Sequence, residues 1–383
     1  MRSLRVLASQ EATPRVTRRA LLAGLTVAGA SALAGCGGSG AIAASARSDG
    51  NLEDQVNLYS WGDYSDPADI SAFTRRYGPR IEIGSFGSNQ ELISKLSAGR
   101  GTSGWDVVVP TSSFVPEMAE HHLLQKLDKS LIPNFAHMDP AYIHRSWDPH
   151  NDYSICKASG TTGFLYDTTA IKRPMVSWKD FLEAVQHDAS GKVAMQTDPW
   201  EVCCCFFAAH GMDPNTTKKA DLDACEKYLL DKIAPHVKAY LSTATSAVAQ
   251  GGFTLIHAYN GDARQAILAA KHPKQWKFVY PTPTANLWMD NWAIARGTQH
   301  PDAAYRFINY MLSDEVAYKE MLYIGYPNGI RSVAPRAKRE KVPYRDLVFP
   351  SADVMKRLTP AKVNSATGRQ TQILNRTMAR SGS

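Results

Sequence analysis

Short runs of β-branched and other apolar residues alternate with amphipathic stretches along the chain from residue 55 onward. In the first part of the chain this pattern predicts strands at 56–59, 80–83 and 106–109 and helices at 67–77, 91–98 and 115–122. The alternation continues with predicted strands at 163–166, 192–196, 253–258 and 277–280. Such an order is typical of an α/β protein with a largely parallel sheet. A body of roughly 330 residues exceeds what one hydrophobic core usually covers, so we expect two α/β lobes.

The head of the chain has the features of an export signal. Arg18 and Arg19 stand before a weakly apolar run at 20–34, an arrangement typical of twin-arginine (Tat) export. The run ends in Leu33-Ala34-Gly35-Cys36, which resembles the lipobox at which a cysteine becomes the acylated first residue of a lipoprotein. A membrane-spanning helix is the alternative, but the run is shorter than the roughly 20 apolar residues that a span needs. We therefore expect a signal peptide over 1–35 and lipid attachment at Cys36.

The signal changes the interpretation of the charge. The whole chain has 43 Lys and Arg against 36 Asp and Glu, but removal of 1–35 takes away five basic residues and one acidic residue, so the net charge falls from +7 to about +3. The remainder contains no basic run that could follow a nucleic-acid backbone, and we expect no nucleic-acid partner. Residues 36–53 are rich in Gly, Ser and Ala and predict a flexible tether that reaches roughly 20 to 25 Å from the anchor.

Short motifs of common enzyme classes are missing from the sequence. It contains no nucleophile elbow, no phosphate-binding loop, no dinucleotide-binding glycine pattern and no zinc-protease motif. His121 and His122 are neighbours that would point in different directions from a helix, so we expect no metal site. A cofactor is not expected either.

Five cysteines remain besides Cys36, and three of them are consecutive. Residues 203–205 lie in the apolar run 202–208, which predicts a buried helix where each Cys serves as a small hydrophobic side chain. Consecutive helical residues fan out and cannot converge on one metal ion. A disulfide between Cys225 and one of the three stays open, because spacing alone does not decide it.

Four short groups combine aromatic side chains with carboxylates. They are Trp61-Gly62-Asp63-Tyr64, Asp198-Pro199-Trp200-Glu201, Tyr259-Asn260-Gly261-Asp262 and Trp288-Met289-Asp290. Each follows a predicted strand or lies in a connection between lobes, and ligands of open α/β sheets bind at the carboxyl ends of strands. Aromatic faces attract cations, and carboxylates accept hydrogen bonds from ammonium groups. The four groups together predict a cleft for a slender organic cation.

A purely structural interpretation exists for each group taken alone. Asp198 would be a good helix N-cap, with Pro199 at the first position and Glu201 reaching back to the cap. Residues 260–262 would begin a helix over 263–270, and 288–290 would pack a core beside a turn.

Longer motifs are spread over residues 56–380. They include Leu58-Tyr59-Ser60-Trp61-Gly62-Asp63-Tyr64, Ser88-Asn89-Gln90-Glu91, Trp105-Asp106-Val107-Val108-Val109-Pro110, Trp288-Met289-Asp290 and Tyr323-Ile324-Gly325-Tyr326-Pro327-Asn328. On these motifs the chain resembles the spermidine/putrescine-binding lipoproteins and periplasmic proteins of bacterial ABC importers. The resemblance implies a two-lobed periplasmic-binding-protein fold of type II, with a hinge, an interlobe ligand cleft and no enzymatic activity.

The resemblance also implies an organisation and partners. Lobe one would cover 54–159 plus 288–331, and lobe two 160–287 plus 332–383. A monomer in the periplasm, or on the outer face of the cytoplasmic membrane, would deliver a polyamine to the permease subunits of an ABC importer. By the same resemblance the ligand-binding residues are Trp61, Asp63, Tyr64, Thr111, Ser113, Asp198, Glu201, Tyr259, Asp262, Trp288, Asp290 and Tyr326.

The choice of polyamine stays open at this stage. Asp198 resembles the spermidine branch of the family, whereas Asp63 and Asp262 are closer to the putrescine branch. Tyr259 stands where the family usually has Trp. A carrier for agmatine or a basic amino acid derivative is the alternative within binding proteins, and an exported hydrolase is the alternative outside them.

Overall fold

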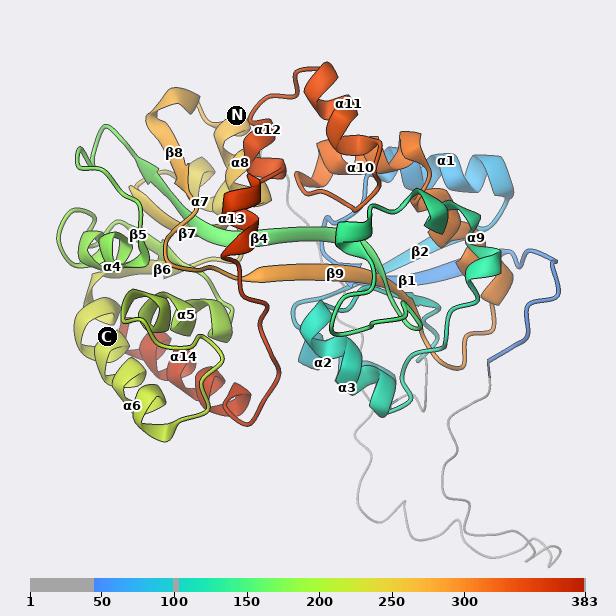
Figure 1. Ribbon diagram of the computed structural model, residues 1–383, viewed down its shortest axis with the longest axis horizontal. Helices are drawn as coiled ribbons and strands as arrows, with labels where there is room; N and C mark the ends of the chain where they lie inside the picture. Colours follow the sequence, from blue (N-terminus) through green and yellow to red (C-terminus); the bar gives the residue numbers. More distant parts are fainter. Residues whose placement is uncertain (1–44, 99–102, 382–383) are drawn as a thin grey trace, which may run out of the picture. The chain divides into compact units, whose positions relative to one another are not determined.

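The structure is a computed structural model that describes residues 45–98 and 103–381 (Figure 1). The predicted signal peptide at 1–35 and the predicted lipidation site Cys36 lie outside these residues. The described strands are β1 (Gln55–Trp61), β2 (Arg80–Phe86), β3 (Val107–Val108), β4 (Ile155–Asp167), β5 (Val193–Met195), β6 (Val237–Tyr240), β7 (Leu255–Tyr259), β8 (Trp276–Val279) and β9 (Leu287–Ile294).

These strands form one mixed sheet in the order β2-β1-β3-β9-β4-β7-β5-β6, with β8 paired to β4. β1 is parallel to β2 and β3, and β5 is parallel to β6 and β7. β4 and β9 are antiparallel to each other and to their other partners. The expectation of a largely parallel sheet is therefore wrong for its middle. β4 runs through the middle of the sheet in one direction and β9 in the other, so the two long strands that lie side by side in Figure 1 are antiparallel.

Helices cover the sheet in an alternating order that confirms the α/β prediction. They are α1 (Pro67–Tyr77), α2 (Asn89–Ala98), α3 (Val115–Glu120), α4 (Trp178–Gln186), α5 (Pro199–Ala209), α6 (Lys219–Tyr228), α7 (Ala244–Gln250), α8 (Asn260–Ala269), α9 (Pro301–Met311), α10 (Asp314–Ile324), α11 (Val333–Arg339), α12 (Arg345–Val348), α13 (Ala352–Lys356) and α14 (Thr367–Ser381). α1 begins where the Asp66 side chain accepts from the Ala68 amide, and it ends at Gly78 with φ 102°.

Large aromatic side chains mark two separate hydrophobic centres. In one, Phe73 of α1 and Trp292 of β9 both pack edge-on against Phe307 of α9, with ring centroids 5.3 and 5.7 Å from it. In the other, Phe181 of α4 packs against Phe164 of β4 at 5.2 Å. β4 and β9 connect the elements around the first centre with those around the second.

The cysteine run lies where the sequence predicts it. Cys203, Cys204 and Cys205 are fully buried in α5, beside Phe206 and Phe207, which confirms their role as small hydrophobic side chains. All five cysteines in the described part of the chain, Cys225 included, are free and buried. The disulfide that spacing left open is not formed in the structure.

Residues 45–53 contact the body of the protein at the start of α9. The Asp302 carboxylate accepts from the Ser48 hydroxyl and from the amides of Asp49 and Gly50, at 2.5 to 3.1 Å. Glu53 in turn accepts from the Ala303 amide at 2.8 Å. This part of the predicted tether is therefore held in place. Within 45–98 and 103–381, no helix has the length and apolar character needed to cross a membrane.

Candidate functional site

Asp290 is buried in the middle of β9 and is held by two hydroxyl groups. Its Oδ1 accepts from Thr111 Oγ1 at 2.6 Å, and its Oδ2 accepts from the Tyr64 hydroxyl at 2.8 Å. Thr111 follows β3 and forms an isolated β-bridge with Asp290. Asn89 fixes Thr111 by accepting from its amide at 2.9 Å. Residues 288–290 lie within β9, which is buried on both faces and connects the elements around the two hydrophobic centres, so the connection at this point is a strand.

Glu201 lies in the first turn of α5, and one of its two carboxylate oxygens has hydrogen-bond partners among the described residues. Oε1 accepts from Thr162 Oγ1 and from Asn286 Nδ2, both at 2.7 Å. Oε2 is buried and has no hydrogen-bond partner in the described part of the chain. Asp198 caps the helix as predicted, accepting from the Glu201 amide at 3.0 Å. The Glu201 side chain does not hydrogen-bond to the backbone of Asp198 as predicted, because it is held by hydrogen bonds from Thr162 and Asn286.

The predicted aromatic residues meet around Trp288. Its ring packs edge-on against Tyr259, at 5.6 Å between centroids, and against Tyr326, at 4.8 Å. Gly160 of β4 lies opposite, where a Cβ atom would come within 2.4 Å of the indole. The absence of a side chain at Gly160 is therefore what admits the Trp288 ring. The Trp288 Nε1 is buried without a hydrogen-bond partner among the described residues.

Asp262 joins this group from the start of α8. Its amide donates to the Tyr326 hydroxyl at 3.1 Å. A Cβ atom at Gly261 would lie 2.4 Å from the Tyr326 ring, so the helix start and the ring can meet only because that residue is glycine. The predicted helix start at 260–262 is thus confirmed, and it supplies a contact to the aromatic cluster as well.

Three predicted residues are not brought into this group. Asp63 is exposed with φ 50°, and its charge acts on Tyr323 instead. Trp61, the last residue of β1, is partly buried and packs against Phe86 with 4.6 Å between ring centroids. Ser113 lies in the 3-10 helix Ser112–Phe114 and shares no hydrogen bond with other residues of the described chain.

Burial dominates the electrostatics of the site. It raises the pKa of Asp290 to about 6, although the hydrogen bonds from Thr111 and Tyr64 oppose the shift. It raises the pKa of Asp262 to about 7, and that of Glu201 to about 8 with a further contribution from the Asp198 charge. Desolvation of its carboxyl group by the surrounding protein also raises the pKa of Asp198, although the residue is exposed at the surface. A bound cation would favour the ionised form of each.

Asn286 and Thr162 were missed from the sequence. Asn286 stands two residues before Trp288, so alternation along a strand would have placed both on one face if β9 had been recognised. Thr162 sits in an uncharged stretch of β4 without a signal of its own. No group of His, Cys, Asp and Glu in 45–98 and 103–381 could hold a metal ion.

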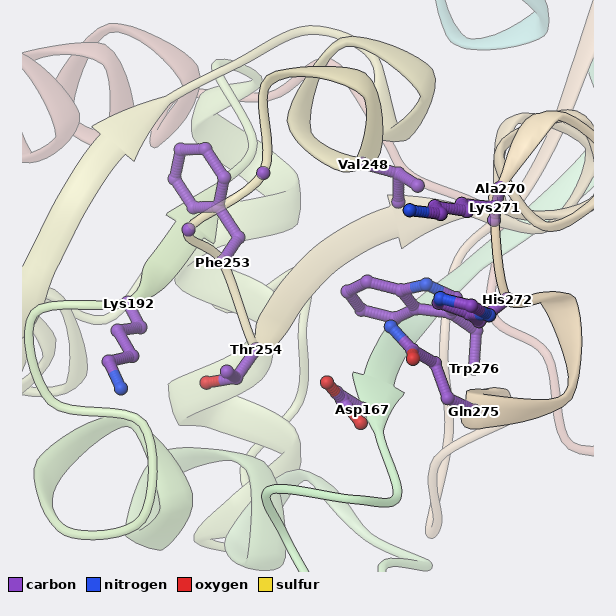
Figure 2. A pocket seen from close by; sticks show the side chains of 12 residues that line it. Asp167, Lys192, Val248, Phe253, Thr254, Ala270, Lys271, His272, Gln275 and Trp276 are labelled. Atoms are coloured by element: carbon purple, nitrogen blue, oxygen red, sulfur yellow. The ribbon is translucent and has the colours of Figure 1, made fainter.

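Figure 2 shows a pocket at the end of β4 and the start of β8, and its volume is about 330 Å³. Asp167, Lys192 and Trp276 are among the residues that line it, and none of the twelve predicted residues does. The pocket in Figure 2 is therefore separate from the cluster around Trp288.

Comparison with known proteins places the chain among transport proteins. A profile of bacterial extracellular solute-binding proteins matches residues 69–344. The chain is 29% identical over 329 residues to spermidine/putrescine-binding periplasmic protein 1 of Haemophilus influenzae, covering 85% of this chain and 89% of that protein. It is 29% identical over 333 residues to the putrescine-binding periplasmic protein SpuD of Pseudomonas aeruginosa, covering 82% and 90%.

A solved structure agrees with the fold. The putative spermidine/putrescine ABC transporter from Listeria monocytogenes superposes with a TM-score of 0.77 at 24% identity, over 85% of this chain and 99% of that one. The predicted periplasmic-binding-protein fold is thereby confirmed.

Proposed function

We propose that this chain, which belongs to the bacterial extracellular solute-binding proteins, captures putrescine or a closely similar diamine and delivers it to an ABC importer. Family membership confirms the prediction of a solute-binding protein rather than an enzyme. The names of the two relatives support a polyamine as the solute. The observation that carries the proposal is the pair of buried carboxylates, Glu201 and Asp290, on either side of Trp288.

The distance along the chain between Asn286, which contacts Glu201, and Asp290 suits a short diamine. Trp288 and Asp290 are alternate residues on one face of β9, and Asn286, which directly precedes the strand, touches Glu201. At a rise of roughly 3.3 Å per residue, Asn286 and Asp290 are about 13 Å apart. The nitrogens of an extended four-carbon diamine are about 6 Å apart, and a hydrogen bond of about 2.8 Å at each end extends this to about 12 Å. The two lengths are similar, which supports putrescine as the ligand, with its methylenes over Trp288.

The free acceptor atoms favour an ammonium over a guanidinium. Glu201 offers only Oε2, since Thr162 and Asn286 occupy Oε1. A guanidinium pairs best with both oxygens of one carboxylate, whereas an ammonium needs one. Agmatine or an arginine derivative would therefore have to displace a buried hydrogen bond at Glu201.

The ligand would bridge the two proposed lobes. Tyr64, Thr111 and Asp290 come from the proposed lobe one, 54–159 plus 288–331, and Glu201, Tyr259 and Asp262 come from the proposed lobe two, 160–287 plus 332–383. A cation held by both sets would stabilise the closed arrangement that a permease recognises. The lipobox at Leu33-Ala34-Gly35-Cys36 supports attachment to the membrane through Cys36.

Calorimetric titration of the protein with putrescine, spermidine, agmatine and arginine tests this function. We expect putrescine to bind most tightly and arginine not to bind. Absence of binding by every amine in the set would refute the polyamine assignment. Tighter binding of agmatine than of putrescine would show that the ligand is a guanidinium compound rather than a diamine.

A further inference from the structure

Lys157 and Glu320 form a buried ion pair next to Tyr64. Lys157 comes from β4, at the irregularity in its pairing with β9, and Glu320 comes from α10. The two side chains are only 1% and 5% exposed, and Lys157 Nζ donates to Glu320 Oε2 at 3.3 Å. Buried pairs of this kind can often be replaced by apolar side chains without loss of stability, because removing both charges from water is costly. The pair therefore points to a role other than stability.

Both partners hold the loop that follows β1. Lys157 Nζ donates to the Tyr64 carbonyl oxygen at 2.5 Å, and Glu320 Oε1 accepts from the Asp66 amide at 2.6 Å. Lys157 Nζ also lies 4.4 Å from the centroid of the Tyr64 ring, within the range of a cation–π contact. The loop over 62–66 is thus fixed at two backbone atoms and at one ring.

The same loop carries the group that touches Asp290. The Tyr64 hydroxyl donates to Asp290 Oδ2, so displacement of the loop would remove one of the two donors that hold this carboxylate. The positive charge of Lys157 also lowers the pKa of Asp290 and partly offsets the effect of burial. The other polar or titratable groups that face Asp290 are Tyr64, Thr111, Cys156 and Tyr326.

We propose that Lys157 and Glu320 are positioning residues that hold Tyr64 and the loop over 62–66 in the arrangement that receives the ammonium group of the ligand beside Asp290. The identity of that ligand rests on the proposed function. The position of the loop does not, because the contacts that fix it are made by the protein's own residues.

The test compares Lys157→Met with Lys319→Met in the full chain. Lys319 is adjacent to Glu320 but 49% exposed, and it pairs with Glu315 on the surface of α10. We expect Lys157→Met to accelerate hydrogen exchange over 61–66 at least tenfold without ligand, and to weaken putrescine binding at least tenfold. The pH midpoint of binding should rise, since Asp290 would lose a favourable charge. Lys319→Met should leave all three readouts unchanged.

A second variant separates positioning from folding. Lys157→Met leaves the buried Glu320 without an opposite charge, so Lys157→Met combined with Glu320→Gln removes both charges and keeps an acceptor for the Asp66 amide. The double variant should melt near the parent temperature yet keep the fast exchange over 61–66 and the weak binding. Parent-like exchange, affinity and pH midpoint in the double variant would overturn the proposal. A parent protein that binds no amine, with fast exchange still seen in Lys157→Met, would refute the polyamine assignment and support the positioning role.

Discussion

The hydroxyl of Tyr64 donates to Asp290 Oδ2 over 2.8 Å, across 226 positions of sequence. This hydrogen bond joins the loop after β1 to the strand that returns through the middle of the sheet. Thr111 completes the arrangement from the end of β3, so three distant segments converge on one buried carboxylate. A carboxylate that is oriented on both oxygens before the ligand arrives needs little rearrangement to receive an ammonium group.

Asp290→Asn tests the charge at this point while keeping the shape of the side chain. Truncating one partner of a desolvated charged pair typically costs about 2 to 5 kcal/mol, so putrescine affinity should fall roughly 30-fold or more. The melting temperature without ligand should barely change, because no buried charge is left unpaired. Calorimetry and thermal melts measure the two effects, with the exposed Asp353→Asn as control. A variant that melts at a lower temperature but binds putrescine like the parent would show that Asp290 stabilises the fold and does not bind the ligand.

Acidity should act on stability and on binding in opposite directions. The pKa values of Asp290, Asp262 and Glu201 are raised to about 6, 7 and 8, whereas unfolded carboxyl groups titrate near pH 4. The resulting destabilisation is absent below about pH 4 and complete above about pH 8. The ligand-free protein should therefore lose stability through these groups as the pH rises across that window.

A cation favours the ionised forms, so affinity should increase over the same window and binding near pH 7 should release protons. Titrations in two buffers of different ionisation enthalpy measure the protons released. Affinity that is flat from about pH 4.5 to about pH 7.5 would contradict the buried carboxylates as ligand groups.

Gly160→Ala tests the support of the aromatic cluster. The added methyl group would lie 2.4 Å from the Trp288 ring and 2.7 Å from Asn260 Oδ1, so the indole must move. We expect a lower melting temperature and weaker putrescine binding, with a change in tryptophan fluorescence. Gly368→Ala in α14, where a Cβ atom meets nothing within 4 Å, is the matched control and should bind normally. Parent-like affinity in Gly160→Ala would show that the position of Trp288 does not matter for the ligand.

Membrane attachment is tested at Cys36. Cys36→Ala should release the protein from the membrane fraction, because the lipobox would lose its acylated residue. Replacement of Arg18 and Arg19 by Lys should block export. Fractionation measures the first effect and secretion the second. A Cys36→Ala protein that stays in the membrane fraction would exclude lipid attachment at this residue.

The sequence predicted individual elements better than their arrangement. The strand at 56–59 and the helix at 67–77 are predicted correctly from local periodicity. β4 was predicted at only 163–166, although it runs from Ile155 to Asp167, because a strand buried on both faces shows no alternation. β9 was missed for the same reason, and with it the antiparallel middle of the sheet.

The site follows the same division. The contact between Trp288 and Tyr326 agrees with the motifs that group them, whereas the ligand-binding roles of these two residues, Asp290 and Glu201 stay predictions. Thr162, Asn286 and Lys157 could not be predicted, because their roles depend on which strands lie side by side. Asp63 was predicted from its neighbours in sequence, but its left-handed backbone at φ 50° and its exposure separate it from Tyr64.

The most direct test of the central claim is the dependence of affinity on diamine length. The full chain is titrated with 1,3-diaminopropane, putrescine, cadaverine and 1,6-diaminohexane, and with butylamine as the monoamine control. If Glu201 and Asp290 hold the two ends of the ligand across Trp288, affinity should peak at the four-carbon diamine and fall strongly for butylamine. In Glu201→Gln or Asp290→Asn the advantage of putrescine over butylamine should largely disappear. Affinity that increases steadily with chain length, or that is equal for putrescine and butylamine, would contradict the account.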